Sequence, residues 1–141
     1  MIRLTGDQLT QIQSAATEAY PAECCGLLVG KNIADDVIEV SRIVPSVNVL
    51  ADKGNDRFEI DPQTRIDLER NLRGTTDSII GHYHSHPDHP AIPSNTDLAQ
   101  AYEPDLIWLI VSVRAGAPKE VKAHRLETVT QKFTEIECVV S

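Results

Sequence analysis

The feature that most constrains the fold of this chain is an uninterrupted apolar segment at residues 106–111, Leu-Ile-Trp-Leu-Ile-Val. A strand with one side facing water alternates apolar and polar residues, so a strand that is apolar throughout is covered on both faces. The segment is also much shorter than the roughly 18 apolar residues of a membrane-spanning helix. We therefore expect it to form a central strand of a covered sheet.

Three helices are predicted, all of them before this strand in the sequence. A capping-box sequence at residues 5–8 and apolar residues at helical spacing predict a first helix over 7–19. An N-cap aspartate followed by proline at residues 61–62 starts a second helix, which runs up to Gly74. A short third helix is expected over 94–101.

Strands are predicted where apolar or β-branched residues run between turn residues. They cover residues 24–29, 37–44, 58–60, 78–84, 106–111, 120–126 and 133–139. The first two form a hairpin, the last two are antiparallel, and residues 45–57 form an irregular loop. The resulting order, α-β-β-α-β-α-β-β-β, predicts an α/β (α+β) fold, a mixed β-sheet with flanking helices.

Length and charge limit the function. A chain of 141 residues is expected to form a single domain over 1–141, with one site. Lys and Arg number 13 and Asp and Glu 21, so the net charge is 13 − 21 = −8, which argues against nucleic acid and anionic membranes as partners. Because no signal-peptide pattern precedes the first helix, we expect a cytoplasmic protein.

The cysteines do not indicate a disulfide framework. Cys24, Cys25 and Cys138 are odd in number, two of them are adjacent, and none has the Cys-x-x-Cys spacing of a zinc ribbon. We expect them to be small buried hydrophobic residues in reduced form.

Four of the five histidines fall within residues 82–89. Side chains two apart on a strand share a face, so His82, His84 and His86 face one side, while Tyr83 faces the other and packs. At about 3.3 Å per residue, His82 and His86 stand about 13 Å apart, too far for one ion with bonds of about 2.0–2.1 Å. A metal ion would therefore be held by an adjacent pair.

A third ligand follows in the sequence. Pro87 ends the strand after His86, and the next loop returns Asp97, which favours His84 and His86 as the pair. Two imidazoles and one carboxylate suit catalytic zinc, because three protein ligands leave the fourth position to water, which becomes a nucleophile near neutral pH. Non-haem iron uses the same ligand types, so they do not separate the two metals.

Simpler interpretations apply to each part of this segment. Exposed histidines in a proline-rich loop bind transition metals adventitiously, and Ser94 with Asp97 matches a helix capping box. The conjunction of both patterns is less easily produced by chance. The absence of Pro-Cys-x-x-Cys argues against a zinc deaminase, and the absence of His-Glu-x-x-His excludes the common helix-borne zinc protease site.

A zinc hydrolase also needs a general base, ideally a carboxylate that is not a ligand. Glu23, between the first helix and an apolar strand, is the candidate, although a glutamate beside a loop is more often solvated surface. Glu23 before Cys-Cys-Gly-Leu-Leu-Val-Gly, His-Ser-His-Pro at residues 84–87, and Ser94 with Asp97 together resemble the JAMM motif of the MPN-plus (Mov34) metalloproteases. The resemblance covers nearly the whole chain and is closest to the small stand-alone bacterial and archaeal members.

The resemblance implies a role for each residue of the motif. One zinc ion per chain would be held by His84, His86 and Asp97, with water at the fourth position. Glu23 would act as general base and then acid. Ser94 would donate a hydrogen bond to the scissile carbonyl and the developing oxyanion.

The family further implies a cytidine-deaminase-like fold and a particular substrate class. The substrates are peptide or isopeptide bonds after the C-terminal Gly-Gly of a ubiquitin-like or sulfur-carrier protein. A narrow groove would admit such a tail, and residues 45–57 could flank it. His82 and His89 lie outside the ligand set and are expected to be outer-shell or exposed residues.

Two alternatives to this function stay open. The first is a non-catalytic MPN scaffold or binding module. Relatives of that kind have lost the metal ligands, whereas every residue of the motif is present in this chain. A metal-dependent hydrolase of a small molecule would share every ligand and differ only in its pocket.

Overall fold

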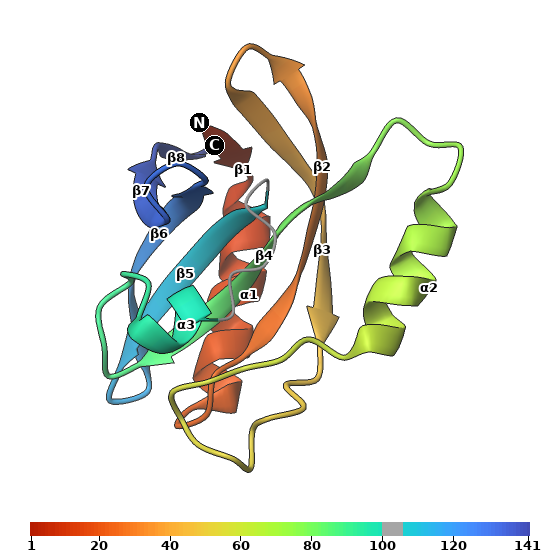
Figure 1. Cartoon of the computed structure of the whole chain (residues 1–141). Helices are drawn as coiled ribbons and strands as arrows, with labels where there is room; N and C mark the ends of the chain where they lie inside the picture. Colours follow the sequence, from red (N-terminus) through yellow and green to blue (C-terminus); the bar gives the residue numbers. More distant parts are fainter. Residues whose placement is uncertain (100–105) are drawn as a thin grey trace.

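The computed structural model describes residues 1–99 and 106–141, in which one mixed sheet is accompanied by three helices (Figure 1). The helices are α1 (Gly6–Ala19), α2 (Pro62–Leu72) and α3 (Asn95–Ala99). The strands are β1 (Ile2–Leu4), β2 (Cys25–Ala34), β3 (Val37–Ser46), β4 (Ser78–Pro87), β5 (Ile107–Arg114), β6 (Ala117–Glu127), β7 (Lys132–Ile136) and β8 (Cys138–Val140). Their order across the sheet is β7-β6-β5-β4-β2-β3-β1-β8. The predicted mixed sheet with flanking helices is confirmed.

The first two helices begin where their capping sequences predict. The Thr5 hydroxyl accepts a hydrogen bond from the Gln8 backbone N–H at 3.1 Å, and the Gln8 side chain accepts one from the Thr5 N–H at 2.9 Å. At α2, the Asp61 carboxylate accepts from the Gln63 N–H at 3.0 Å. Residues 100 and 101 of the predicted third helix lie outside the described residues. No described helix is long and apolar enough to cross a bilayer.

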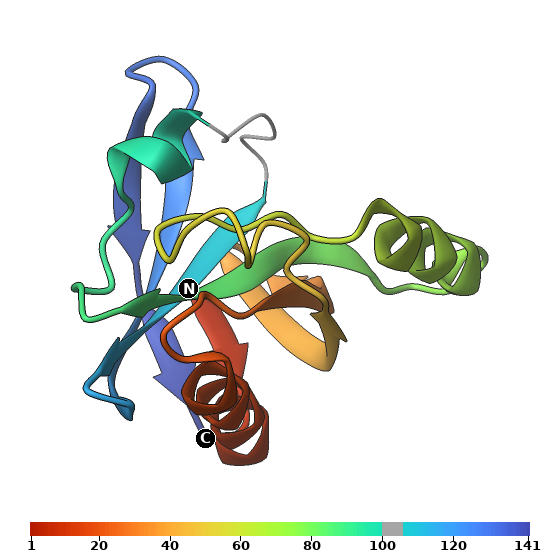
Figure 2. The same cartoon turned by 90° about the horizontal axis from the view of Figure 1, so that it is seen from below.

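The two faces of the sheet are covered by different helices, as Figure 2 shows for α1 and α2. On one face, Ile12 of α1 belongs to the main apolar core, together with Leu28 and Tyr83. Gly26 is required beneath the Tyr83 ring, because a Cβ at this position would lie 2.3 Å from ring atoms. On the other face, Leu68 of α2 packs with residues of β2.

The central apolar segment behaves as predicted. β5 lies between β6 and β4, and its residues from Ile107 to Val113 are buried on both faces. It is an interior strand, although β4 and β2 occupy the middle of the sheet. Because β4 pairs with β5 in parallel and with β2 in antiparallel fashion, the histidine segment is hydrogen-bonded along both edges.

The sheet curls, because its two edge strands are consecutive in the sequence. β7 and β8 occupy opposite ends of the strand order, yet Glu137 alone separates them. β7 pairs with β6 in antiparallel fashion, and β8 pairs with β1 in parallel, with Arg3 opposite Val139. The predicted single strand over 133–139 is therefore two short strands with different partners.

Two further predictions are corrected by the structure. Residues 58–60 do not form a strand, since Ile60 makes only an isolated bridge to Asn48. The strand β1 was not predicted, because three residues carry too little pattern and their partners lie far away in the sequence. The hairpin strands and β4 are also longer than predicted.

The cysteines match their prediction as unpaired residues. Cys24 and Cys25 are buried and Cys138 is partly buried, and all three are free thiols. Burial raises the pKa of the Cys24 thiol to about 11 and that of Cys25 to about 12, so both stay protonated and unreactive at neutral pH.

Candidate metal centre

Strand β4 presents three histidines on one face and Tyr83 on the other, as the alternation predicts. His82, His84 and His86 are all buried, and the ring centroids of neighbouring histidines lie 5.7 and 4.9 Å apart along the strand. Both edges of β4 are paired with neighbouring strands, which fixes the histidine backbone before any metal binds. The strand ends at Pro87, where the chain turns toward α3.

The structure brings together His84, His86 and Asp97, the three predicted ligands, as a buried group that could hold a metal ion. The two histidine Nε2 atoms are 3.1 Å apart, and Asp97 Oδ2 lies 3.4 Å from His84 Nε2 and 3.0 Å from His86 Nε2. Three atoms bound at about 2.0–2.1 Å in a tetrahedron lie about 3.3 Å from one another. The spacing of the donor atoms therefore fits a tetrahedral ion such as zinc.

Surrounding groups orient two of these ligands. His86 Nδ1 lies 2.9 Å from the Pro90 carbonyl oxygen, to which it can only donate, so Nε2 is left with its lone pair toward the group. The Phe58 ring stacks on the His84 ring, with centroids 4.3 Å apart and planes inclined by 18°. The sequence places Phe58 before the second helix but gives it no role at the site, because an aromatic residue after a loop is indistinguishable from an ordinary core residue.

The electrostatics keep the group ready to bind a cation. Burial pushes the pKa of Asp97 upward, but the hydrogen bonds with His84 and His86 outweigh it and hold the Asp97 pKa well below its usual range. Burial lowers the pKa of His84. Burial also lowers that of His86, but hydrogen bonds to Asp97 and Pro90 reverse the effect, so the His86 pKa is raised. Asp97 is thus an anion in a buried site, a costly state unless a cation or hydrogen bonds compensate it.

Glu23 is buried rather than solvated. Its side chain is 3% exposed, and its Oε1 atom has no hydrogen-bond partner among the described residues. Burial raises the pKa of Glu23 to about 8, while the nearby charge of His86 lowers it and that of Asp97 raises it. The Glu23 carboxyl is therefore influenced by the charges of two predicted ligands, His86 and Asp97.

The chain around Glu23 is fixed to β4 through Ser85, which sequence reasoning did not single out. The Cys24 N–H donates to the Ser85 hydroxyl at 2.8 Å, and the Ser85 N–H donates to the Cys24 carbonyl at 3.2 Å. Ser85 lies between the two predicted histidine ligands and is fully buried. The same residue thus connects the glutamate segment to the histidine segment.

Asn48 organises the loop beside the site. Its side-chain amide donates to the carbonyl oxygens of Glu23 and Arg57 at 2.9 and 3.2 Å. Its oxygen accepts from the N–H groups of Leu50 and Glu59 at 3.0 and 3.1 Å. Both donors and the acceptor are therefore used. An asparagine in a polar loop gives no sequence signal of such a role, so only the structure reveals it.

Ser94 lies at the start of α3 and on the surface. Its hydroxyl accepts from the Asp97 N–H at 3.1 Å, and the Asp97 carboxylate accepts from the Ser94 N–H at 2.9 Å. The capping interpretation is therefore correct, and it coexists with the metal interpretation because the Asp97 carboxylate serves both. The Ser94 hydroxyl hydrogen is not used by that bond.

The other two histidines of the segment lie outside the ligand group. His82 is buried between Phe58 and Trp108, with its ring 4.3 Å from that of Trp108 in an edge-on arrangement. Burial lowers the pKa of His82 to about 3, so it is neutral. His89 is exposed. Both placements agree with the prediction.

Comparison with known proteins shows the family. The family model described as prokaryotic homologs of the JAB domain matches residues 6–127. A desampylase from Haloferax volcanii is 33% identical over 115 residues, which cover 79% of this chain and 80% of the relative. A CysO-cysteine peptidase from Mycobacterium tuberculosis is 27% identical over 123 residues, which cover 87% of this chain and 81% of the relative.

A solved structure shares the fold of this chain. The solution structure of a protein from Desulfitobacterium hafniense has a TM-score of 0.84 at 32% sequence identity, and the match covers 100% of this chain and 93% of the other. The chain belongs to the prokaryotic JAB domain family, and so to the small JAMM/MPN proteins.

Proposed function

We propose that this protein is a zinc-dependent peptidase or isopeptidase, formed by a single domain over residues 1–141. It hydrolyses the bond after the C-terminal Gly-Gly of a ubiquitin-like or sulfur-carrier protein. The observation that carries the proposal is the buried group of His84, His86 and Asp97, together with the buried and unpaired carboxyl of Glu23. The residue after Glu23, Cys24, is hydrogen-bonded to Ser85, which lies between the two histidines. The names of the relatives, desampylase and CysO-cysteine peptidase, support this class of reaction.

One zinc ion per chain would be held by Nε2 of His84, Nε2 of His86 and Oδ2 of Asp97, whose spacing fits it. When bound, zinc supplies the Lewis acidity that makes water a nucleophile near neutral pH. The Pro90 carbonyl keeps His86 in the tautomer that presents Nε2. His84 is held by pairing of β4 with both β2 and β5, and His86 by pairing with β5.

Glu23 is the general base in this proposal. Its unpaired Oε1 takes the proton from the attacking water and then passes it to the leaving amine. Burial raises its pKa to about 8 in the metal-free protein. A bound zinc ion nearby would lower that pKa, so that the carboxylate can accept the proton and the resulting acid can return it. The bonds that Ser85 and Asn48 make to this segment hold the backbone from which the carboxyl extends.

Ser94 stabilises the developing oxyanion. Its oxygen is the acceptor for the Asp97 N–H, so its hydroxyl hydrogen is available to the carbonyl oxygen of a substrate. The residue is exposed, so a bound tail can reach it. A donor of this kind contributes about 3–4 kcal/mol to the transition state in comparable sites.

The test is incubation of the purified, zinc-loaded protein with carrier proteins fused through Gly-Gly to a second protein, followed by intact-mass analysis of both products. We expect cleavage directly after Gly-Gly and about one zinc ion per chain. Glu23→Gln should keep its zinc and lose activity by about 10²–10⁴-fold. Glu18→Gln, on the exposed side of α1, is the matched control and should keep full activity.

Other outcomes point elsewhere. If zinc is bound and no fusion is cleaved, the protein is instead a small-molecule hydrolase or a binding module. If Glu23→Gln turns over at the wild-type rate, Glu23 is not the base.

A further inference from the structure

The segment that joins the two predicted ligands His86 and Asp97 reaches β6 on its way from β4 to α3, and Ala91 lies near its middle. Ala91 is 0% exposed, although it belongs to no helix or strand. Its backbone N–H and C=O are therefore shielded from water without strand partners, and such groups need other hydrogen-bond partners. Side chains of β6 supply them.

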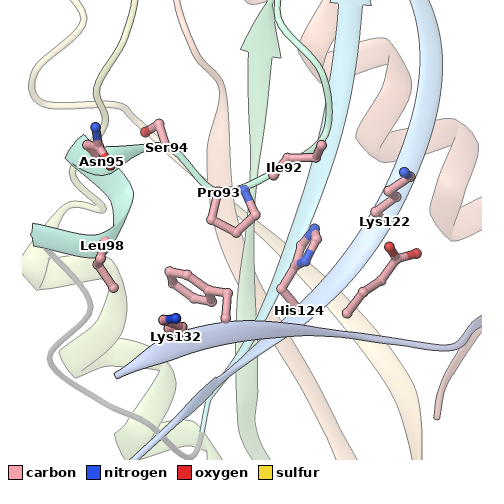
Figure 3. A pocket seen from close by; sticks show the side chains of 10 residues that line it. Ile92, Pro93, Ser94, Asn95, Leu98, Lys122, His124 and Lys132 are labelled. Carbon is pink, nitrogen blue, oxygen red and sulfur yellow. The ribbon is translucent and has the colours of Figure 1, made fainter. Parts of the chain in front are cut away.

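Two residues of β6 hold Ala91 by both of its backbone groups. The Ala91 N–H donates to Glu120 Oε1 at 3.2 Å, and His124 Nε2 lies 2.9 Å from the Ala91 carbonyl oxygen. Because a carbonyl oxygen only accepts, His124 Nε2 carries the hydrogen of this bond. Figure 3 shows the His124 ring directed toward the segment with Ile92 and Pro93, which follows Ala91. Glu120 and His124 thus fix the course of this segment.

Glu120 lies at an irregularity of β6. The pairing of β5 with β6 shifts its register at Ser112, so that Lys119 and Glu120 together lie opposite this one residue. Such a β-bulge changes the direction of the side chains at that point. The Glu120 N–H donates to the buried Ser112 hydroxyl at 3.1 Å, and Ser112 is also the β5 residue directly opposite His86. Glu120 is therefore anchored in the same part of the sheet as His86.

A single peptide group connects Glu120 with His86. The Ala91 N–H that donates to Glu120 and the Pro90 carbonyl that lies 2.9 Å from His86 Nδ1 belong to the same peptide unit. Because that unit is planar, holding its N–H also fixes the direction of its C=O. Hydrogen bonds in such a chain polarise one another, so the bond to Glu120 makes the carbonyl a stronger acceptor. The carbonyl in turn keeps the hydrogen on His86 Nδ1 and leaves Nε2 free for a metal ion.

We propose that Glu120 is a positioning residue of the metal centre, which acts on His86 through the Pro90–Ala91 peptide. His124 supports it by holding the next peptide unit. This inference rests on the proposed binding of zinc. An ion pair with Lys122 does not account for Glu120, because the two charged groups are 4.0 Å apart and partly exposed, and such pairs contribute little.

The first test measures zinc affinity by competition with a chromophoric chelator. Glu120→Leu removes the acceptor, and we expect its zinc dissociation constant to rise about tenfold, the lower end of the range for outer partners of a metal ligand. Glu120→Gln keeps an acceptor oxygen and loses only the charge, so it should retain nearly the wild-type affinity. The matched control is Glu127→Leu on the same strand, whose carboxylate accepts from the Thr134 hydroxyl, and it should bind zinc as the wild type does.

The same measurement applies to His124. His124→Leu should weaken zinc binding less than Glu120→Leu does, because His124 holds the peptide unit after the one that contacts His86. His124→Gln places an amide N–H near the position of the ring Nε2 and should restore the wild-type affinity.

A second readout follows the His86 ring itself. In the zinc-loaded wild type, the Nδ1 proton of His86 should give a resolved NMR signal, because its bond to the Pro90 carbonyl protects it from exchange with water. The signal should exchange faster or disappear in Glu120→Leu and persist in Glu120→Gln and Glu127→Leu. A purely structural role of Glu120 would lower the free energy of unfolding and leave both the zinc affinity and this signal of the folded protein unchanged.

The outcomes separate the inference from the proposed function. Wild-type affinity together with a retained signal in Glu120→Leu overturns the inference and leaves the proposed hydrolysis intact. An equal loss of affinity in Glu120→Gln and Glu120→Leu also overturns it, because the charge rather than the hydrogen bond would then be responsible. If Glu120→Leu fails to fold, Glu120→Asp tests the same bond, since its shorter carboxylate should not reach the Ala91 N–H; weaker zinc binding there supports the inference and unchanged binding overturns it. A wild type that binds no zinc refutes the proposed function, and the inference with it.

Discussion

The two faces of strand β4 differ in how completely their groups are satisfied. On the α1 face, the Tyr83 ring fills the space above Gly26, and its neighbours are apolar. On the metal face, three buried polar atoms have no partner among the described residues, namely Glu23 Oε1, His82 Nδ1 and His84 Nδ1. Such groups destabilise a fold by about 1–3 kcal/mol each. The α1 face therefore stabilises the fold. The metal face lowers the stability, because its carboxyl and imidazole groups are left without partners and so stay available for chemistry.

The largest expected effect comes from breaking the metal face at Asp97. Asp97→Ala removes a ligand and the carboxylate that lies 3.0–3.4 Å from the two histidine nitrogens. We expect zinc affinity to fall by more than the 10- to 100-fold that loss of an outer partner produces. Zinc content after dialysis, measured by atomic emission, checks this, with Asp35→Ala in the distant hairpin as control. Full zinc occupancy in the Asp97→Ala variant would mean that Asp97 only caps α3 and is not a zinc ligand.

The next effect concerns the pH dependence of stability in the metal-free protein. Burial raises the pKa of Glu23 from 4.5 to about 8. Between these two pH values, Glu23 is therefore protonated in the folded protein and ionised in the unfolded chain. Its stabilising contribution is full below pH 4.5 and is lost as the pH rises to about 8. Glutamine cannot ionise, so the Glu23→Gln variant does not lose this contribution. Its free energy of unfolding, relative to that of the wild type, should therefore rise by about 2–4 kcal/mol between pH 4.5 and pH 8.

The measurement for this effect is urea denaturation at several pH values with a chelator present. Glu18→Gln, whose side chain is exposed, should show no such trend. A difference between Glu23→Gln and wild type that stays constant from pH 5 to pH 8 would show that Glu23 is not buried as described.

A smaller effect is expected on the α1 face. In Gly26→Ala the new methyl group would lie 2.3 Å from the Tyr83 ring, which is buried and cannot move aside freely. We expect a loss of about 1–3 kcal/mol in the free energy of unfolding, as in other overpacked cores. Zinc content should not change. Gly6→Ala, where nothing lies within 4 Å of the added atom, is the control in the same denaturation experiment.

The smallest effect is expected at Asn48. Asn48→Ala removes four hydrogen bonds, one to the Glu23 carbonyl and three to backbone groups of the loop that holds Asn48. The three loop groups lie near the surface and can bond to water instead. We expect about 1 kcal/mol of lost stability and faster amide exchange at Leu50 and Glu59. Hydrogen exchange followed by mass spectrometry checks this. Unchanged exchange at both amides would mean that the loop does not depend on Asn48.

The ligand group was predictable because each of its signals is local. The two-residue period of a strand places His84 and His86 on one face, and the capping pattern that brings Asp97 back is contained in four residues. The capping sequences of α1 and α2 are equally local, and the structure confirms them. Glu23 needed the family resemblance, because its sequence surroundings alone are those of a surface residue.

The features that were missed depend on contacts between distant segments. Asn48 and Phe58 acquire their roles only when their loop folds against Glu23 and His84. The strand formed by Ile2–Leu4 exists because β3 and β8 supply partners on both sides. In each case the residue type is compatible with several structures, and tertiary pairing selects one of them.

The pairing of β1 with β8 has a consequence for how the protein folds. Ile2 lies opposite Cys138, so closing the sheet joins segments at nearly opposite ends of the sequence. Contacts with such large sequence separation form late, since the entropy of a long loop must be lost before they add stability. During synthesis on the ribosome, β1 therefore cannot pair with β8 until almost all of these residues have been made. Sheet closure should be a late event in folding, after β4 has already paired with β2 and β5.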